Sequence, residues 1–309
     1  MKEKIRTGVI GVGYMGRLHA LKYAAHPMAE LIGVFDIDRK QAEKVANEVG
    51  VEVFTELDAL LASIDACSIA TPTSSHFALA SKCLQLGKHV LLEKPLAETV
   101  EEGEALLEMA QKQGVILAVG HLTRHHPAVV RLLQYGWGPA SYLEAERLGP
   151  FKLRSLDVDV IADLMVHDLD LALLFLQGEP VDVRAIGVAV ATDQIDIARA
   201  WIEFAKERVA NIASSRISAK PNRKIRLFWH AHYASIDFFE NTLLVSHKLG
   251  QTIKTENFHF EAPDLLYDEI DSFLNASENG EIFCTAEEAC RVLALAQRIS
   301  HAAKKNTDA

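Results

Sequence analysis

The stretch that decides the fold is Ile5–Gly16, which reads I-R-T-G-V-I-G-V-G-Y-M-G. It opens with a short apolar, β-branched run that ends at Ile10. The run breaks into the pattern Gly11-x-Gly13-x-x-Gly16, and Met15–Ala25 has the composition of a helix. The stretch therefore predicts a buried strand, a tight turn and a helix in direct succession.

Each of the three glycines has a steric role at its position in the turn. Gly11 allows a turn that a Cβ would obstruct, Gly13 lets the backbone approach a pyrophosphate, and Gly16 lets the helix lie close to the strand. The helix start offers unpaired N–H groups and a positive dipole end to phosphates. An ordinary glycine-rich turn has the same letters, so the context has to decide between the two readings.

The context favours a dinucleotide site. A second strand, Leu31–Phe35, ends in Asp36, twenty residues after Gly16, where the acid for an adenosine ribose is expected. A carboxylate there accepts from a 2′-hydroxyl and repels a 2′-phosphate, so NAD is favoured over NADP. Arg39 and Lys40 follow closely and weaken that preference.

Composition sets further bounds. The 309 residues are enough for two domains, and 49% hydrophobic and 24% charged residues are ordinary for a globular protein. A net charge of −10 argues against a nucleic-acid partner. A charged start without a signal peptide, and no long apolar run, predict a cytoplasmic protein without a membrane span. Four cysteines without C-x-x-C spacing favour reduced thiols, and the histidines lack zinc spacing, so no metal is expected.

Residues 1–121 alternate strands and helices. The predicted strands are 5–10, 31–35, 51–54, 64–70, 89–92 and 115–119, and the predicted helices are 15–25, 41–49, 56–62, 76–86 and 100–113. This order predicts an α/β fold whose N-terminal domain is a Rossmann-type, doubly wound parallel sheet. Ligands bind beyond the carboxyl ends of such strands, so Gly11, Asp36, Thr71, Glu93-Lys94 and Gly120-His121 should line one cleft.

Residues 122–309 predict a second, α+β domain for substrate binding and oligomerisation. Helices are expected at 127–134, 160–176, 265–277 and 285–304, and strands at 141–147, 183–191, 197–204, 210–217, 224–229, 234–239 and 242–247. Several strands alternate in the half-buried manner of a large, open, mostly antiparallel sheet. An open apolar face usually carries a partner, so we expect a homodimer or homotetramer built on this sheet.

Three stretches carry candidate chemistry. Pro95 keeps Lys94 extended at a strand end, where its ammonium could face the nicotinamide or simply solvent. Asp163 and His167 are four residues apart on one predicted helical face, with Asp170 three further on. Such a carboxylate fixes the tautomer of an imidazole base, although a surface pair without a catalytic role has the same spacing. Arg124 could hold substrate or cofactor, or cap a strand end.

Taken together, these motifs resemble the Gfo/Idh/MocA family, which includes glucose–fructose oxidoreductase and inositol 2-dehydrogenase. The resemblance rests on the glycine turn, Thr71-Pro72 with His76, Glu93-Lys94-Pro95, the Gly120 to Pro127 run and the Asp163–Asp170 segment, in this order. It implies NAD(P)-dependent oxidation or reduction at a sugar or polyol carbon. It also implies that Lys94, Asp163 and His167 match the family's catalytic lysine, aspartate and histidine.

A narrower resemblance points to the branch that includes UDP-N-acetylglucosamine 3-dehydrogenases. It rests on stretches such as G-H-L-T-R-H-H-P-A and N-I-A-S-S-R-I-S, although that branch commonly has Glu-Arg-Phe-Asn where this chain has Thr123-Arg124-His125-His126. It implies a nucleotide sugar oxidised at C3. The arginines of the second domain could bind its diphosphate bidentately or be unrelated surface residues. These arginines are Arg147, Arg154, Arg216 and Arg223.

The expected site follows from these observations. The cofactor contacts are expected from Gly11, Gly13, Tyr14, Met15, Gly16, Asp36, Arg39, Thr71, Pro72, His76, Glu93, Lys94 and Arg124. The substrate contacts are expected from His121, Arg147, Arg154, Asp163, His167 and Arg216. Two rival functions remain open, namely a dehydrogenase for a free polyol such as inositol, and an NAD-sensing regulator on the same fold without turnover.

Overall fold

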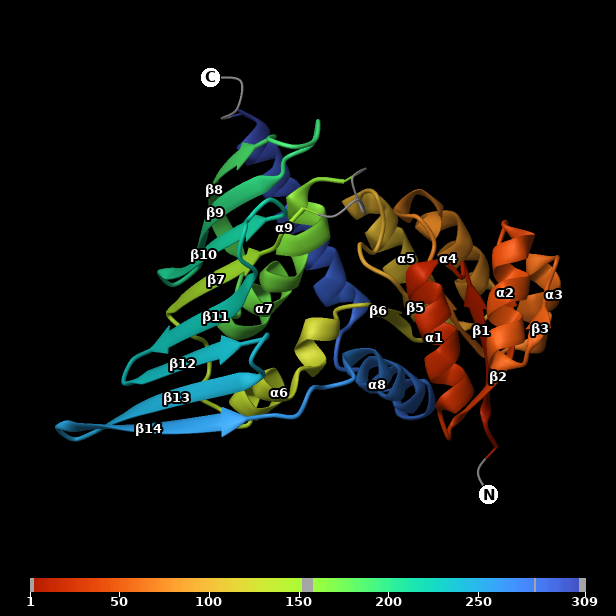
Figure 1. Ribbon diagram of the computed structural model, residues 1–309, viewed down its shortest axis with the longest axis horizontal. Helices are drawn as coiled ribbons and strands as arrows, with labels where there is room; N and C mark the ends of the chain where they lie inside the picture. Colours follow the sequence, from red (N-terminus) through yellow and green to blue (C-terminus); the bar gives the residue numbers. More distant parts are fainter. Residues whose placement is uncertain (1–2, 152–157, 281, 306–309) are drawn as a thin grey trace. The chain divides into compact units, whose positions relative to one another are not determined.

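A computed structural model describes residues 3–151, 158–280 and 282–305 (Figure 1). The chain forms two compact units. The first unit comprises Met1–Leu122 and Asp264–Leu293, and the second comprises Thr123–Pro263 and Ala294–Ala309. The sequence pattern predicts a boundary after residue 121, whereas the chain also returns to the first unit at Asp264–Leu293.

The first unit is built on a six-stranded parallel sheet in the order β3-β2-β1-β4-β5-β6. This is the strand order of a dinucleotide-binding Rossmann fold, in which the order reverses between β1 and β4. The strands are β1 (Ile5–Ile10), β2 (Ala29–Phe35), β3 (Glu52–Val53), β4 (Ala66–Ile69), β5 (His89–Leu92) and β6 (Leu117–Val119). Every residue of β4 is buried, as expected for a parallel strand covered on both faces.

Helices cover both faces of this sheet. One core cluster joins it to α1 (Tyr14–Ala25), α2 (Arg39–Val49) and α8 (Leu265–Asn279). A second cluster joins the opposite face to α3 (Leu57–Ser63), α4 (His76–Gln85), α5 (Val100–Gln113) and the start of α9 (Ala286–Lys305). Helix α8 and the start of α9 thus belong to the Rossmann unit. Their position late in the chain does not indicate this.

The second unit is built on an eight-stranded sheet in the order β14-β13-β12-β11-β7-β10-β9-β8. Its strands are β7 (Tyr142–Leu148), β8 (Pro180–Val188), β9 (Ile197–Phe204), β10 (Arg208–Ser215), β11 (Asn222–Trp229), β12 (His232–Asp237), β13 (Thr242–Leu249) and β14 (Thr252–His259). Strands β7 and β10 pair in parallel, and the other pairs are antiparallel. The expected large, mostly antiparallel sheet is therefore confirmed.

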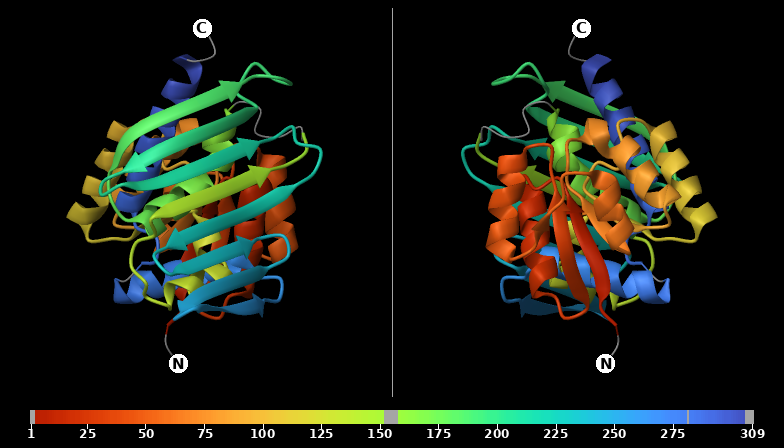
Figure 2. Two further views of the ribbon diagram at one scale, coloured as in Figure 1. Left: turned by 90° about the vertical axis from the view of Figure 1, so that its left-hand side faces the viewer. Right: turned by 90° about the vertical axis from the view of Figure 1, so that its right-hand side faces the viewer.

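Among the described residues, helices of the same unit cover one face of this sheet. Helix α7 (Val166–Leu176) packs on β7 and β10, and α6 (Pro127–Leu133) packs near β12. The later part of α9 approaches β8, where Ala303 lies against Gly187. Figure 2 (left) shows the other face with no helix over it. Burial alternates accordingly along the strands, as in β9 and β7.

Two elements differ from the sequence expectation. Strand β14 was not predicted, because its residues are mostly polar and exposed, and it is held by pairing with β13 at the sheet edge. The predicted helix over 160–176 begins with a π-helical turn, Ile161–Met165, before α7. Asp159 caps this turn by accepting from the backbone N–H groups of Ile161 and Ala162. Within the described residues, no helix is both long and apolar enough to cross a membrane.

Candidate active site

The glycine turn between β1 and α1 has the geometry that the sequence predicts. Gly11 has a φ of +79°, in the left-handed region that favours glycine. A Cβ on Gly16 would lie 1.8 Å from the carbonyl oxygen of Gly11, so only glycine permits this approach. A Cβ on Gly13 would meet nothing within 4 Å, and Gly13 begins α1 without a side-chain cap. The space and the N–H groups that a pyrophosphate needs are therefore present.

Asp36 holds this turn from the end of β2. Its carboxylate accepts from the backbone N–H of Val12 at 2.7 Å and from that of Asp38 at 2.8 Å. Gln41 donates to the carbonyl oxygen of Val12 at 2.7 Å. A carboxylate has about four lone-pair sites, so two N–H donors leave Asp36 capacity for a ribose hydroxyl. Arg39 is exposed and forms an ion pair with Glu43 on the same helix.

A histidine ties together two strand ends of the same unit. His76 Nδ1 lies 2.8 Å from the carbonyl oxygen of Pro95, and its Nε2 lies 2.9 Å from that of Thr71. The side chain is buried, so it fixes the Thr71-Pro72 turn after β4 relative to the Glu93-Lys94-Pro95 segment after β5. Lys94 is thereby placed at the carboxyl edge of the parallel sheet, where ligands of such folds bind.

Glu93 is anchored by a buried polar network that the sequence analysis missed. Its Oε1 lies 3.1 Å from Nε2 of His19, whose Nδ1 lies 2.9 Å from the hydroxyl of Ser68. Tyr23 bonds the same hydroxyl at 2.8 Å. Burial alone would raise the pKa of Glu93, but His19 and Lys94 outweigh it and hold that pKa below its usual value. The only signal in the sequence was the spacing of His19 and Tyr23, one turn apart on α1.

Beside this network lies a second buried carboxyl group, Glu269 of α8. It is 4% exposed, and both oxygens are buried without a hydrogen-bond partner among the described residues. Burial, and then the charge of Glu93, raise its pKa well above the ordinary value of 4.5. The carboxyl group of Glu269 therefore keeps its proton to a higher pH than it would in water.

In the second unit, two buried ion pairs fix helix α7. Arg147 at the end of β7 donates to both carboxylate oxygens of Asp168, at 2.9 and 2.8 Å. Arg124 forms a pair with Asp170 at 2.7 Å, and both side chains are 1% exposed. Because each carboxylate belongs to α7, the pairs set the rotation of the helix that carries His167. Arg124, expected at the cofactor, has this structural role in the second unit.

Asp163 lines a cavity of about 250 Å³ in the second unit. It lies within the π-helical turn, a feature that is frequent at functional sites. The other lining residues are Arg147, Leu148, Gly149, Pro150, Leu164, Arg216, Pro221, Arg223 and Phe239. They come from the ends of β7 and β10, the start of β11, and the turn after β12.

The structure brings three of the four candidate arginines to this one cavity. Arg147 is paired with Asp168, and Arg216 donates to the carbonyl oxygen of Val158 at 2.8 Å with Asp196 4.0 Å away. These two are therefore built into the protein and present charge in fixed positions. Arg223 is exposed, and Arg154 lies outside the described residues. Lys94 belongs to the first unit, and Asp163 and His167 belong to the second.

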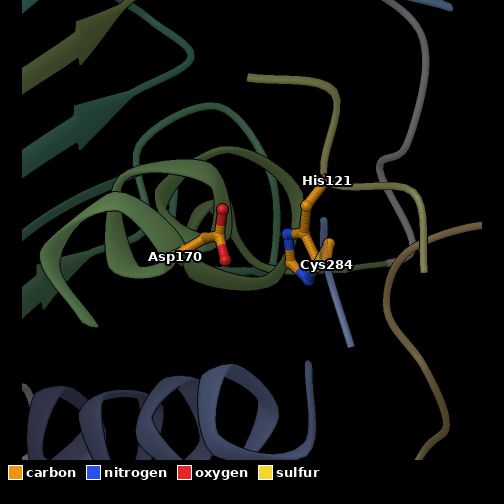
Figure 3. A group of neighbouring side chains, drawn as sticks. All are labelled: His121, Asp170 and Cys284. Carbon is orange, nitrogen blue, oxygen red and sulfur yellow. The ribbon is translucent and has the colours of Figure 1, made fainter. Parts of the chain in front are cut away.

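Figure 3 draws three potential metal ligands, His121, Asp170 and Cys284. His121 and Cys284 belong to the first unit, and their potential ligand atoms lie within 4.8 Å of each other. Asp170 belongs to the second unit, where Arg124 neutralises it. Each unit by itself thus contributes fewer of these ligands than the three or four of a typical zinc site.

The chain matches two family descriptions in succession. Residues 5–121 match the oxidoreductase family with an NAD-binding Rossmann fold, and residues 135–231 match the GFO/IDH/MocA C-terminal domain. The chain belongs to the Gfo/Idh/MocA oxidoreductases. The predicted family, the two-domain fold class and NAD as cofactor are thereby confirmed for this Gfo/Idh/MocA oxidoreductase.

Individual relatives of this Gfo/Idh/MocA oxidoreductase differ in sequence identity and in the share of the chain that they match. UDP-N-acetylglucosamine 3-dehydrogenase of Acidithiobacillus ferrooxidans is 49% identical over 302 residues, which cover 96% of each chain. Its solved structure gives a TM-score of 0.94 and covers 98% of this chain and 99% of that one. The NAD-dependent scyllo-inositol 2-dehydrogenase of Bacillus subtilis is 30% identical over 236 residues, 71% of this chain and 69% of that protein.

Replacing Glu269 by Gln is expected to change how stability depends on pH. In the unfolded chain this carboxyl ionises near its ordinary pKa of 4.5, whereas folding raises the pKa. The wild-type protein therefore loses stability as pH rises above about 4.5, until the folded group also ionises. The variant, which has no proton to lose, should gain in melting temperature relative to wild type across this range, by a few degrees or about 1 kcal/mol.

The measurement is the melting temperature of both proteins at pH 5 to 9. Glu278→Gln, an exposed position on the same helix, is the matched control and should give a difference that is flat with pH. A flat difference for Glu269→Gln as well would contradict a raised pKa at this site.

Proposed function

We propose that this oxidoreductase oxidises a secondary hydroxyl of a nucleotide sugar with NAD, and that its substrate is UDP-N-acetylglucosamine, oxidised at C3. The observation that carries the proposal is the arginine-lined cavity of the second unit, which joins fixed positive charge to Asp163. A negatively charged nucleotide sugar suits such a cavity better than a neutral polyol does. The 49% identical relative named for that activity supports the same choice.

The proposed roles follow the family motif. His167, oriented by Asp163, takes the proton of the substrate hydroxyl, and Lys94 stabilises the developing alkoxide by its positive charge. Bound NAD supplies the acceptor for the hydride that leaves the carbinol carbon. The glycine turn with Asp36 holds the dinucleotide, and His76 and Glu93 hold the Lys94 segment in place.

Two other functions make different demands on the chain. The 30% identical scyllo-inositol 2-dehydrogenase favours a free-polyol dehydrogenase. A neutral polyol, however, does not need the arginines that line the cavity. An NAD-sensing regulator needs the cofactor turn alone, and the presence of Lys94, Asp163 and His167 argues against it. We also infer a cytoplasmic location, which agrees with four buried cysteines that form no disulfide within the described residues.

Absorbance at 340 nm, where reduced nicotinamide absorbs, tests the function. The wild-type protein with NAD should reduce the cofactor when UDP-N-acetylglucosamine is added, and much less with inositol or N-acetylglucosamine. Lys94→Ala and His167→Ala should each lose about 10²–10⁴-fold in turnover, the usual contribution of general acid–base catalysis. NAD binding should persist in both variants.

Lys112→Ala, an exposed lysine of α5, is the control and should retain full turnover. Reduction with inositol but not with the nucleotide sugar would favour the polyol enzyme. NAD binding without reduction by any sugar would favour the regulator, and full turnover in either active-site variant would refute the assigned roles.

We further propose that the uncovered face of the eight-stranded sheet joins two copies of the chain in a homodimer or homotetramer. A row of aromatic side chains crosses this face through Trp201, Tyr142, Phe228 and Tyr233, with successive ring centroids 6.4, 5.5 and 5.1 Å apart. Ile186, Val188 and Ile197 add exposed apolar side chains on β8 and β9, at exposures of 40 to 56%. Exposed apolar side chains that gather on one face are typical of an interface, and a twofold axis lets one such face pack on its copy.

Trp201→Glu should shift the protein towards monomer, because it places a charge within the aromatic row. Light scattering coupled to size-exclusion chromatography measures the mass. Leu86→Glu, at a similarly exposed apolar position of the first unit, is the control and should leave the mass unchanged. A wild-type monomer, or an unchanged oligomer in Trp201→Glu, would contradict the proposed interface.

A further inference from the structure

One wall of the cavity in the second unit combines a cation with an aromatic ring. The guanidinium of Arg223 lies 5.2 Å from the ring centroid of Phe239, and both residues line the cavity. Arg223 is exposed, and Phe239 is 47% exposed. Both groups are therefore accessible to a ligand that enters the cavity.

The position of Arg223 favours an anionic ligand. On the neighbouring strand it is the direct register partner of Arg147, so two arginines face each other across β11 and β7. Like charges that are directly opposite in a sheet destabilise it. Asp168 forms an ion pair with Arg147, and an anion bound near both arginines would be attracted by both guanidinium groups. Arg216 adds a third guanidinium to the same lining.

Hydrogen bonds hold the backbone of the turn that carries Phe239. Asp237 ends β12 and accepts from the N–H groups of Phe239 and Glu240, at 3.0 and 3.2 Å. The N–H of Phe238 donates to the carbonyl oxygen of Arg223 at 2.9 Å, which ties the turn to β11. An exposed aromatic ring on a well-held turn is suited to stacking with a nucleobase, whatever the base.

The size of the cavity and the positions of its charged residues indicate how a nucleotide sugar would be oriented in it. At about 250 Å³ it is slightly smaller than typical sites for whole drug-sized ligands, which begin near 300 Å³. It therefore takes part of a nucleotide sugar. Asp163 marks the lining where the reacting sugar belongs, and Arg223 with Phe239 offers the contacts for a diphosphate and a base.

We infer that Arg223 and Phe239 recognise the nucleoside diphosphate half of the substrate, Arg223 through a phosphate oxygen and Phe239 through the face of the base. This rests on the proposed nucleotide-sugar function and adds the residues that select it over a free sugar. Arg147 and Arg216 add two guanidinium groups to the same lining, held by Asp168 and by the carbonyl oxygen of Val158.

Calorimetric titration of the NAD-saturated protein with UDP, uridine and pyrophosphate tests the inference. Saturation with NAD keeps these probes out of the cofactor turn. Arg223→Gln should weaken UDP and pyrophosphate about 10- to 100-fold, the size expected for the loss of one charge-assisted contact. Phe239→Ala should weaken UDP and uridine and leave pyrophosphate unchanged.

Kinetics separate recognition from catalysis. For UDP-N-acetylglucosamine, Arg223→Gln should raise KM by the same factor as it weakens UDP, with kcat within about threefold and KM for NAD unchanged. Arg223→Lys should recover part of the loss, since it restores the charge without the planar fork. Arg298→Gln, an arginine of α9 that donates to the carbonyl oxygen of Pro180, is the control and should behave as wild type.

The outcomes are distinguishable. If Arg223→Gln weakens UDP no more than Arg298→Gln does, the inference is overturned. If wild type does not bind UDP but reduces NAD with a free sugar, the inference and the nucleotide-sugar substrate both fail while the dehydrogenase activity stands. If wild type turns over the nucleotide sugar and both variants match it, only the assignment of these two residues fails.

Discussion

The second unit depends on the buried ion pair between Arg147 and Asp168. It joins the end of β7 to α7 with two hydrogen bonds, and its side chains are 7% and 3% exposed. Breaking such a pair by removing one partner typically costs about 3–5 kcal/mol, because the other charge stays buried. A hydrophobic pair could provide similar stability, so the main contribution of this ion pair is to position α7 and Arg147. It fixes the helix that follows Asp163 and leaves one edge of Arg147 on the cavity wall.

In the first unit, backbone contacts and hydrogen bonds hold the candidate site segments in position. Its glycine turn works because backbone approaches backbone, with Gly16 against Gly11, and Asp36 and Gln41 then hold Val12 by hydrogen bonds. The Lys94 segment is held by His76 on one side and by the network of Glu93, His19 and Ser68 on the other. In both units the side chains proposed for catalysis, Lys94, Asp163 and His167, are half-buried and have neighbours that hydrogen bonds hold in place. Such neighbours can keep a catalytic group close to its productive geometry.

The sequence predicted what local spacing determines. The glycine turn, the buried parallel strands and the alternation of the large sheet all follow from short-range patterns and are present. It did not predict pairings between distant residues. Arg147 pairs with Asp168, and Arg124 pairs with Asp170. From the sequence alone, both arginines were candidates for binding substrate or cofactor. The carboxyl of Glu269 reads as an ordinary surface charge of a helix until burial is known. The polar strand β14 exists only because β13 offers it an edge.

In the proposed reaction, hydride leaves C3 of a nucleotide sugar and is delivered to NAD. UDP-N-acetylglucosamine that carries deuterium at C3, with mass spectrometry of the nicotinamide product, tests this transfer. We expect the reduced cofactor to gain one deuterium while the sugar becomes a 3-keto nucleotide sugar. Reduced cofactor without deuterium would show that hydride leaves another carbon, and no reduced cofactor from a protein that binds both ligands would refute the proposed reaction.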